Sequence, residues 1–258
     1  MESIKKVFEY RTMIASLVRR DLRGRYKGSV LGFAWTFINP LLQLGVYTLV
    51  FSVIMRNGIE DYYLFLFVAL IPWIFFATSV SGGSTCVIVQ KNMVEKIYFP
   101  REVLPISYVT AQLINMLLSF IVVLAVLVFS GKGVNVTALL YLPIIALVEY
   151  LLALGLAMIT CALTVYLRDL EYLLGIITMA WQFLSPVLYS INDVPERLRP
   201  IFMINPMSPV IVAYRDILYY KTAPQLGTLL SATVMGIFFL LFGWILFGHL
   251  QKHFVEEF

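Results

Sequence analysis

The sequence predicts an all-α integral membrane protein that crosses the bilayer six times. Sixty per cent of the 258 residues are hydrophobic, only 13% are charged, and the mean hydropathy is +0.87. A water-soluble fold of this length could not bury so much apolar surface. Apolar runs recur along the chain at the length of about 20 residues that a helix needs to cross a bilayer. We expect residues 1–258 to form a single transmembrane domain.

Six apolar segments are long enough to be transmembrane helices, and Glu149 is the one charged residue away from their ends. The predicted spans are residues 31–55, 63–89, 104–130, 138–166, 171–191 and 226–250. An even number of spans places both termini on one side. With that side in the cytoplasm, 13 Lys and Arg are cytoplasmic and 6 are external, in agreement with the excess of basic residues in cytoplasmic loops. We therefore expect cytoplasmic N- and C-termini.

The segment 1–28 has the pattern of an amphipathic interface helix. Eight of the 19 Lys and Arg precede residue 30. At about 100° per residue, apolar side chains of this segment fall within one arc of roughly 120°. They are Ile4, Val7, Phe8, Ile14, Ala15, Leu17, Val18 and Leu22. The pattern predicts a helix that lies on the inner membrane surface. The alternative is a basic tail that only directs membrane topology.

The loop after the second span contains a predicted short helix within residues 91–100. Asn92 and Glu95 have the spacing of a capping box, and Pro100 ends the helix. The apolar pairs at i,i+4 spacing are Met93 with Ile97 and Val94 with Tyr98. These pairs offer apolar surface to something outside the bilayer. The alternative is a compact turn without a partner.

Residues 194–220, between the last two spans, contain an uncharged stretch of 15 residues broken by prolines. This stretch is too short and too interrupted to cross as a helix. Asn205 and Pro206 make a turn, and Ser208 as N-cap with Pro209 behind it begins a second helical arm. We predict an external re-entrant hairpin that lines a cavity, because non-helical backbone at membrane depth needs protein or water around it. The alternative is a helix pair on the extracellular surface.

The sequence has no signature of an enzyme or of a bound cofactor. No Gly-x-x-x-x-Gly-Lys-Ser/Thr motif is present, so we expect no ATP site in this chain. His249 and His253 lack a third ligand beyond Glu256 or Glu257, and we assign no metal and no catalytic residue. The basic residues gather near the N-terminus rather than over a folded face, and we expect no nucleic-acid partner.

Five side chains at membrane depth are candidates for lining a substrate conduit. Trp73 and Trp181 each lie ten residues inside a predicted span, which is about 15 Å at 1.5 Å per residue. Together with Phe76 and Tyr47 they can stack on sugar rings, which have apolar faces and polar edges. Glu149 is a candidate because an intramembrane carboxylate is costly. The alternative for all five is helix packing, with one buried hydrogen bond for Glu149.

Several stretches of sequence occur in an order that resembles one transporter family. They are Arg25 to Pro40 (RYKGSVLGFAWTFINP), Tyr98 to Pro105 (YFPREVLP), Arg168-Asp169, Ser185 to Tyr189 (SPVLY), and Asn205 to Pro209 (NPMSP) followed by Tyr214-Arg215. Together they are similar to the permease subunits of ABC exporters for polysaccharides and polyol phosphates. This group contains the O-antigen permease Wzm and the capsule and teichoic-acid permeases. The resemblance runs from about residue 10 to the end of the chain.

The resemblance implies a function, partners and site residues. It implies a homodimeric conduit in the bacterial cytoplasmic membrane, two separate ATP-binding cassette subunits that bind ATP and Mg, and a lipid-linked polysaccharide as substrate. The implied coupling helix, which contacts the ATPase, comprises Asn92, Met93, Val94, Glu95, Lys96, Ile97 and Tyr98, with Arg101 close behind. The implied external gate comprises Pro195, Pro200, Asn205, Pro206, Pro209 and Arg215.

Two other functions stay open on the sequence. ABC permeases that export small amphiphiles or drugs share the broad fold. A membrane enzyme acting on lipid-linked sugars would need a carboxylate or histidine cluster at one membrane face, and Asp169 with Glu171 beside Arg168 is the cytoplasmic candidate. We interpret this pair instead as a cap at the N-terminus of a helix.

Overall fold

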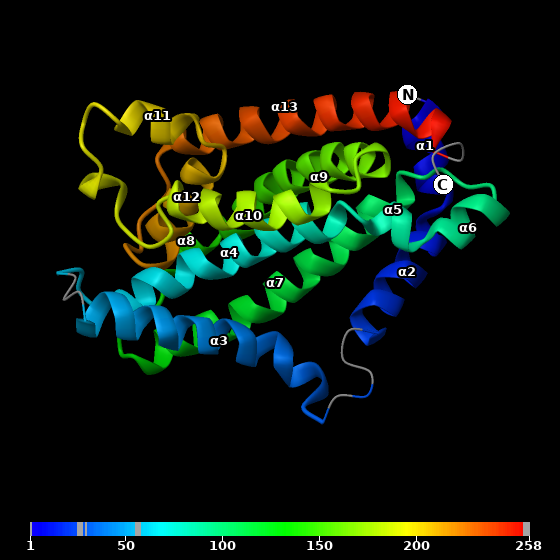
Figure 1. Cartoon of the computed structure of the whole chain (residues 1–258). Coiled ribbons are helices and arrows are strands. Elements are labelled where there is room, and N and C mark those ends of the chain that lie inside the picture. Colours follow the sequence, from blue (N-terminus) through cyan, green and yellow to red (C-terminus); the bar gives the residue numbers. More distant parts are fainter. Residues whose placement is uncertain (1, 25–27, 29, 55–57, 255–258) are drawn as a thin grey trace.

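The computed structural model describes residues 2–24, 28, 30–54 and 58–254, and within these ranges the chain forms helices and no strand (Figure 1). The α-helices are α1 (Glu2–Glu9), α2 (Arg11–Gly24), α3 (Trp35–Thr48), α4 (Tyr62–Gly83), α5 (Cys86–Val89), α6 (Lys91–Lys96), α7 (Val103–Phe129), α8 (Val136–Leu139), α9 (Leu142–Tyr166), α10 (Leu170–Phe183), α11 (Arg199–Ile204), α12 (Met207–Leu218) and α13 (Leu226–Leu250). A π-helical turn, Leu49–Ile54, extends α3. The predicted all-α fold is confirmed.

Five helical segments are long and apolar enough to cross a membrane. They are Trp35–Ile54, Tyr62–Gly83, Val103–Phe129, Val136–Tyr166 and Leu226–His253. Each coincides with one of the predicted spans, although the second predicted span, 63–89, is divided where α4 ends and α5 begins. Met55, the predicted end of the first span, lies outside the described residues.

The remaining predicted span, 171–191, is shorter in the structure than the sequence suggests. α10 has 14 residues, which correspond to about 21 Å of helix against about 30 Å of bilayer hydrocarbon. The chain leaves the helix at Leu184, two residues before Pro186. Proline has no N–H to donate and its ring clashes with the preceding helical turn. Length and composition of the described helices therefore support five spans.

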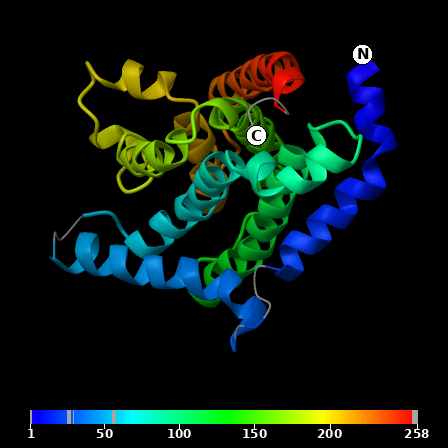
Figure 2. The same cartoon turned by 45° about the vertical axis from the view of Figure 1, so that its right-hand side comes forward.

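The helix α4 lies in the middle of the bundle. Every residue from Leu64 to Trp73 is buried, which is typical of a helix that others surround on all sides. The helices α3, in blue, and α13, in red, lie on opposite sides of it (Figure 2) and expose apolar side chains. Both described ends of the chain lie at the same end of the bundle as α5 and α6 (Figure 1). The predicted interface and coupling segments thus share one end of the molecule.

The predicted interface helix, residues 1–28, is divided into α1 and α2, which meet at Tyr10. Leu17 and Val18 of α2 are buried, and α2 packs along α7. Part of its apolar side therefore covers protein rather than lipid. Residues 25–27, at the end of the predicted helix, lie outside the described residues.

Glycines allow α9 and α13 to pack against each other along their length. A Cβ atom added to Gly155 would lie 2.4 Å from the backbone carbonyl carbon of Phe239, and one added to Gly243 would lie 2.3 Å from the carbonyl oxygen of Gly155. A side chain at either position would therefore force the two backbones apart. In a membrane, where lipid is as apolar as the side chains, such close packing is a main source of helix association.

We expect Gly155→Val to destabilise the protein by about 1–3 kcal/mol or more, because the new side chain meets backbone that cannot move aside. Thermal unfolding of the detergent-solubilised protein measures this effect. Gly227→Ala, also on α13, is the control because an added Cβ there meets no atom within 4 Å. Equal melting temperatures for the two variants would contradict the close crossing.

Candidate functional site

Two apolar side chains are exposed next to each other at the end of the bundle where α6 lies. α6 ends at Lys96, and Ile97 and Tyr98 follow it, 57% and 91% exposed. Val94 is only 6% exposed and packs into the core. The apolar surface open to a partner is therefore Ile97 with Tyr98, and not the predicted pair of Val94 with Tyr98.

The predicted coupling helix differs from α6 in two further details. α6 begins at Lys91 without a side-chain cap, so Asn92 and Glu95 do not form the predicted capping box. Glu95 instead lies 3.6 Å from Lys91 across one helical turn. The helix also ends before residue 100, because the residue that precedes Pro100 is disfavoured in helical backbone.

A cavity of about 720 Å³ opens between α1, the chain after α6 and the end of α13. Arg101, in its lining, donates a hydrogen bond to the backbone carbonyl of Gln251. The side-chain amide of Gln251 donates to the carboxylate of Glu102 at 2.8 Å. Burial lowers the pKa of Arg101, and the nearby Glu102 carboxylate opposes this effect. These contacts tie the start of α7 to the segment after α13.

At the opposite end of the bundle, Asn205 joins the predicted hairpin to the end of α10. Its Oδ1 accepts hydrogen bonds from Trp181 Nε1 at 2.8 Å and from the backbone N–H of Met207 at 3.0 Å. Its Nδ2 donates to Ser185 Oγ at 2.8 Å and to the carbonyl of Leu184 at 3.1 Å. One amide side chain therefore joins the end of α10 to the start of α12.

The two arms of the predicted hairpin are α11 and α12. Pro200 lies in the first turn of α11 and Pro209 in the first turn of α12, where a missing N–H leaves no helical bond unmade. Pro195, before α11, is exposed, and Pro206 directly precedes α12. Ser208 is not the N-cap as predicted, because α12 already begins at Met207 and Asn205 binds its first N–H.

Arg215 of α12 is buried, with 3% of its surface exposed. It donates hydrogen bonds to the carbonyl oxygens of Pro186, Val187 at 2.6 Å and Tyr189 at 3.0 Å. Its guanidinium also lies 3.5 Å from the centroid of the Phe65 ring on α4. A buried charge is tolerated only with such partners. We call these contacts the Arg215 clamp, which joins α12, α4 and the turn after α10.

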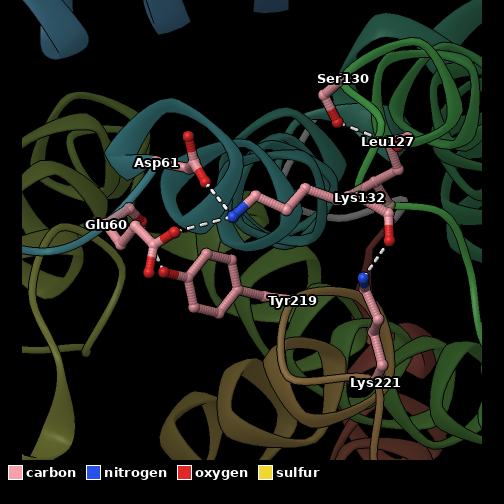
Figure 3. A network of polar contacts seen from close by, with 7 residues as sticks. All are labelled: Glu60, Asp61, Leu127, Ser130, Lys132, Tyr219 and Lys221. Carbon is pink, nitrogen blue, oxygen red and sulfur yellow. Dashed lines mark hydrogen bonds and ion pairs between the residues drawn. The ribbon is translucent and has the colours of Figure 1, made fainter.

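Further polar contacts join three loops, namely the loop before α4, the loop after α7 and the loop after α12. Lys132, after α7, lies 2.6 Å from a carboxylate oxygen of Asp61 and 2.9 Å from one of Glu60 (Figure 3). Tyr219 donates to the backbone carbonyl of Glu60 at 2.5 Å, and Lys221 donates to that of Lys132. The hydrogen bonds to Asp61 and Glu60 raise the pKa of Lys132. Any stability from this pairing is thus present below the ordinary lysine pKa and lost as pH rises through the raised value.

Three predicted conduit residues form one aromatic cluster inside the protein. The ring centroids of Trp73 and Phe76 are 5.5 Å apart, and those of Phe76 and Trp181 are 5.1 Å apart. Trp73 is 3% exposed and Phe76 is fully covered. Trp181 and Tyr47 are partly buried against the core. Of the four predicted rings, only these last two have surface that a ligand could reach in this structure.

Glu149 lies inside α9 and is completely buried. Tyr214 of α12 donates a hydrogen bond of 2.8 Å to its Oε2, and the Tyr214 ring stacks on Phe120 with centroids 5.3 Å apart. Its Oε1 has no hydrogen-bond partner in the described part of the chain. This geometry agrees with the packing alternative, in which Glu149 joins α9 to α12 beside the Arg215 clamp.

The alternative enzymatic candidates lie at the start of α10. Asp169 precedes the helix without a side-chain cap bond, and Glu171 lies in its first turn. Among the described residues, no group of three His, Cys, Asp or Glu could hold a metal ion. Glu256 and Glu257, considered with the histidines, lie outside those residues.

Sequence comparison identifies the family. The model of the ABC-2 type transporter family matches residues 12–219. The O-antigen export system permease protein RfbA of Myxococcus xanthus is 33% identical over 256 residues, which cover 98% of each chain. RfbA of Klebsiella pneumoniae is 30% identical over 244 residues, covering 95% of this chain and 94% of its own. The polysialic acid transport protein KpsM of Escherichia coli is 23% identical over 234 residues, covering 87% and 89%.

The Arg215 clamp predicts a large effect of Arg215→Met. We expect a loss of about 2–5 kcal/mol in folding free energy, because the carbonyls of Pro186, Val187 and Tyr189 lose their charged donor. Arg215→Lys should recover only part of this loss, since an ammonium group lacks the planar set of donors. The control is Arg197→Met, because Arg197 is exposed in the segment that precedes α11. A melting temperature for Arg215→Met equal to that of the control would contradict the clamp.

The matched region, residues 12–219, includes α6, the aromatic cluster, the hairpin and the Arg215 clamp. The similarity to RfbA of Myxococcus xanthus extends over nearly the whole of both chains. The chain therefore belongs to the ABC-2 type transporter family.

Proposed function

We propose that this chain is the permease subunit of an ATP-driven exporter that moves a lipid-linked polysaccharide, of O-antigen, capsule or teichoic-acid type, across the bacterial cytoplasmic membrane. Membership of the family makes it a multi-pass transport subunit that works with separate ATP-binding subunits. The observation that carries the substrate proposal is the similarity to an O-antigen export permease over 98% of both chains. The relative named for polysialic acid transport supports the same substrate class.

The assembly we propose contains two copies of the chain and two ATP-binding cassette subunits, which hold ATP and Mg. Support for a second copy comes from the helical segment Trp35–Ile54, which contains α3. Within one chain, only 11% of the residues in its most apolar stretch are buried. Asn39 and Gln43 are exposed on this helix. Amide side chains are unfavourable against lipid, so another protein surface or a water-filled conduit must cover them.

The topology we propose has six crossings with both termini in the cytoplasm. Its support is the distribution of Lys and Arg described above and the position of both chain ends beside α6 (Figure 1). In this topology, α10 together with the turn at residues 184–190 makes the fifth crossing. The Arg215 clamp supplies the hydrogen bonds that this turn needs at membrane depth.

Two ends of the molecule have separate roles in this proposal. The α6 loop receives motion from the ATPase through Ile97 and Tyr98, and its link from Arg101 to Gln251 passes that motion to α7 and α13. The hairpin of α11 and α12 is the outer gate. Trp181 contributes to the conduit as a partly exposed ring next to the gate residue Asn205.

Deletion of the gene should abolish surface polysaccharide, and the wild-type gene should restore it.

We expect the double variant Ile97→Asp, Tyr98→Asp to insert normally but to lose co-purification with the ATPase. It should restore less than about a tenth of export, because two charges cannot occupy an apolar pocket without partners. Immunoblotting of membranes and quantification of surface polymer measure the two properties.

The matched control is the conservative double variant Ile97→Val, Tyr98→Phe, which should export normally. Full export by the Asp variant would refute the coupling role of this surface. Unchanged surface polysaccharide in the deletion strain would refute the proposed substrate class.

A further inference from the structure

A polar cavity of about 410 Å³ lies among α3, α4 and α7. Thr36, Asn39 and Gln43 of α3 line it, and so do Gln112, Asn115 and Ser119 of α7. Each set has i, i+3, i+7 spacing and therefore lies on one face of its helix. Gln112 is nine residues from the start of α7, about 13 Å along the helix from the end where α6 lies. The cavity thus brings two rows of neutral polar side chains together at membrane depth.

Two of these side chains have buried hydrogen-bonding atoms without a partner among the residues that the structure describes. Gln112 and Asn115 are 3% and 9% exposed, and in the described part of the chain Gln112 Nε2 and Asn115 Oδ1 have no hydrogen-bond partner. Such groups cost folding free energy, and most buried polar groups are paired. One is a donor and the other an acceptor, one helical turn apart. A ligand that offers both kinds of partner would satisfy them.

The charge of the lining restricts the class of ligand. The described residues that line the cavity include no Asp, Glu, Lys or Arg. A phosphate or carboxylate would therefore find no cation to pair with, and a hydrocarbon chain would leave the amides unsatisfied. Trp35 and Phe75, also in the lining, offer flat apolar faces. Hydroxyl groups around a ring with apolar faces, as in a neutral sugar, match both features.

From this arrangement we infer that the cavity binds neutral sugar units of the exported polymer through their hydroxyl groups. This inference rests on the proposed function and names the contacts that such a substrate makes. The cavity volume is in the usual range for small-molecule sites. Hydrogen bonds from neutral amides are weak enough to form and break as a polymer advances, as conduction through a pore requires.

The test uses the purified full-length protein in nanodiscs and maltohexaose as a neutral probe. Saturation-transfer NMR should detect binding of maltohexaose to the wild type. The double variant Gln112→Leu, Asn115→Leu should bind about tenfold more weakly, which corresponds to the loss of two neutral hydrogen bonds. The control is Ser79→Ala, which removes a buried hydroxyl that has no partner among the described residues and does not line the cavity.

The melting temperature separates a binding role from a structural one. Because Gln112 Nε2 and Asn115 Oδ1 have no partner among the described residues, the Leu variant should unfold at the same temperature as the wild type or higher. A lower melting temperature would overturn the inference, because the amides would then stabilise the fold. Equal maltohexaose binding by both proteins, or binding of glucose 1-phosphate in preference to maltohexaose, would also overturn it. If deletion of the gene left surface polysaccharide unchanged, the proposed function would be refuted independently of this inference.

Discussion

The hydrogen bonds from Arg215 to the backbone carbonyls of Pro186, Val187 and Tyr189 determine how one end of this membrane protein is built. α10 stops after 14 residues, and the turn that follows exposes carbonyls that no helix satisfies. In an apolar environment such groups need internal donors. The guanidinium of Arg215 supplies several N–H donors from one plane. The carbonyls that accept these hydrogen bonds in turn offset the cost of burying its charge. The irregular turn after α10, and its packing against α12 and α4, thus depend on one buried side chain.

The rest of the bundle connects this end to the opposite one. α9 and α13 are held together by the crossing at Gly155 and Gly243, and Glu149 joins α9 to α12 next to the Arg215 clamp. At the other end, Arg101 joins the start of α7 to the segment after α13. In the function we propose, ATP-driven motion enters at the exposed Ile97 and Tyr98 surface and opens the hairpin. The packed helices between them provide a continuous path, and the polar cavity beside α3 provides contacts for the polymer.

Sequence patterns predicted the helical fold and most span positions closely, because runs without charge report membrane burial directly. They predicted a short helix within residues 91–100 but not which of its side chains are exposed, since Val94 belongs to the buried core of the fold. Arg215 was predicted as a gate residue only by family resemblance, because a single basic residue between spans looks like a loop charge until its carbonyl partners are known. Gln112 and Asn115 were not predicted, because a neutral amide within an apolar run stands out neither as a charge nor as an aromatic ring. Their i, i+3 spacing on α7 was the available signal.

In the function we propose, the hairpin of α11 and α12 must move for export. Tyr189, in the turn after α10, and Phe202, on α11, have ring centroids 6.3 Å apart. Cysteines at these two positions, in a protein with Cys86 and Cys161 replaced by alanine, can be joined by a short reducible bismaleimide. The measurement is the appearance of newly made polysaccharide on the surface of treated cells. If the hairpin is the gate, export stops when the cross-link forms and resumes when a reductant cleaves it, whereas export at an unchanged rate with the cross-link intact would contradict this role.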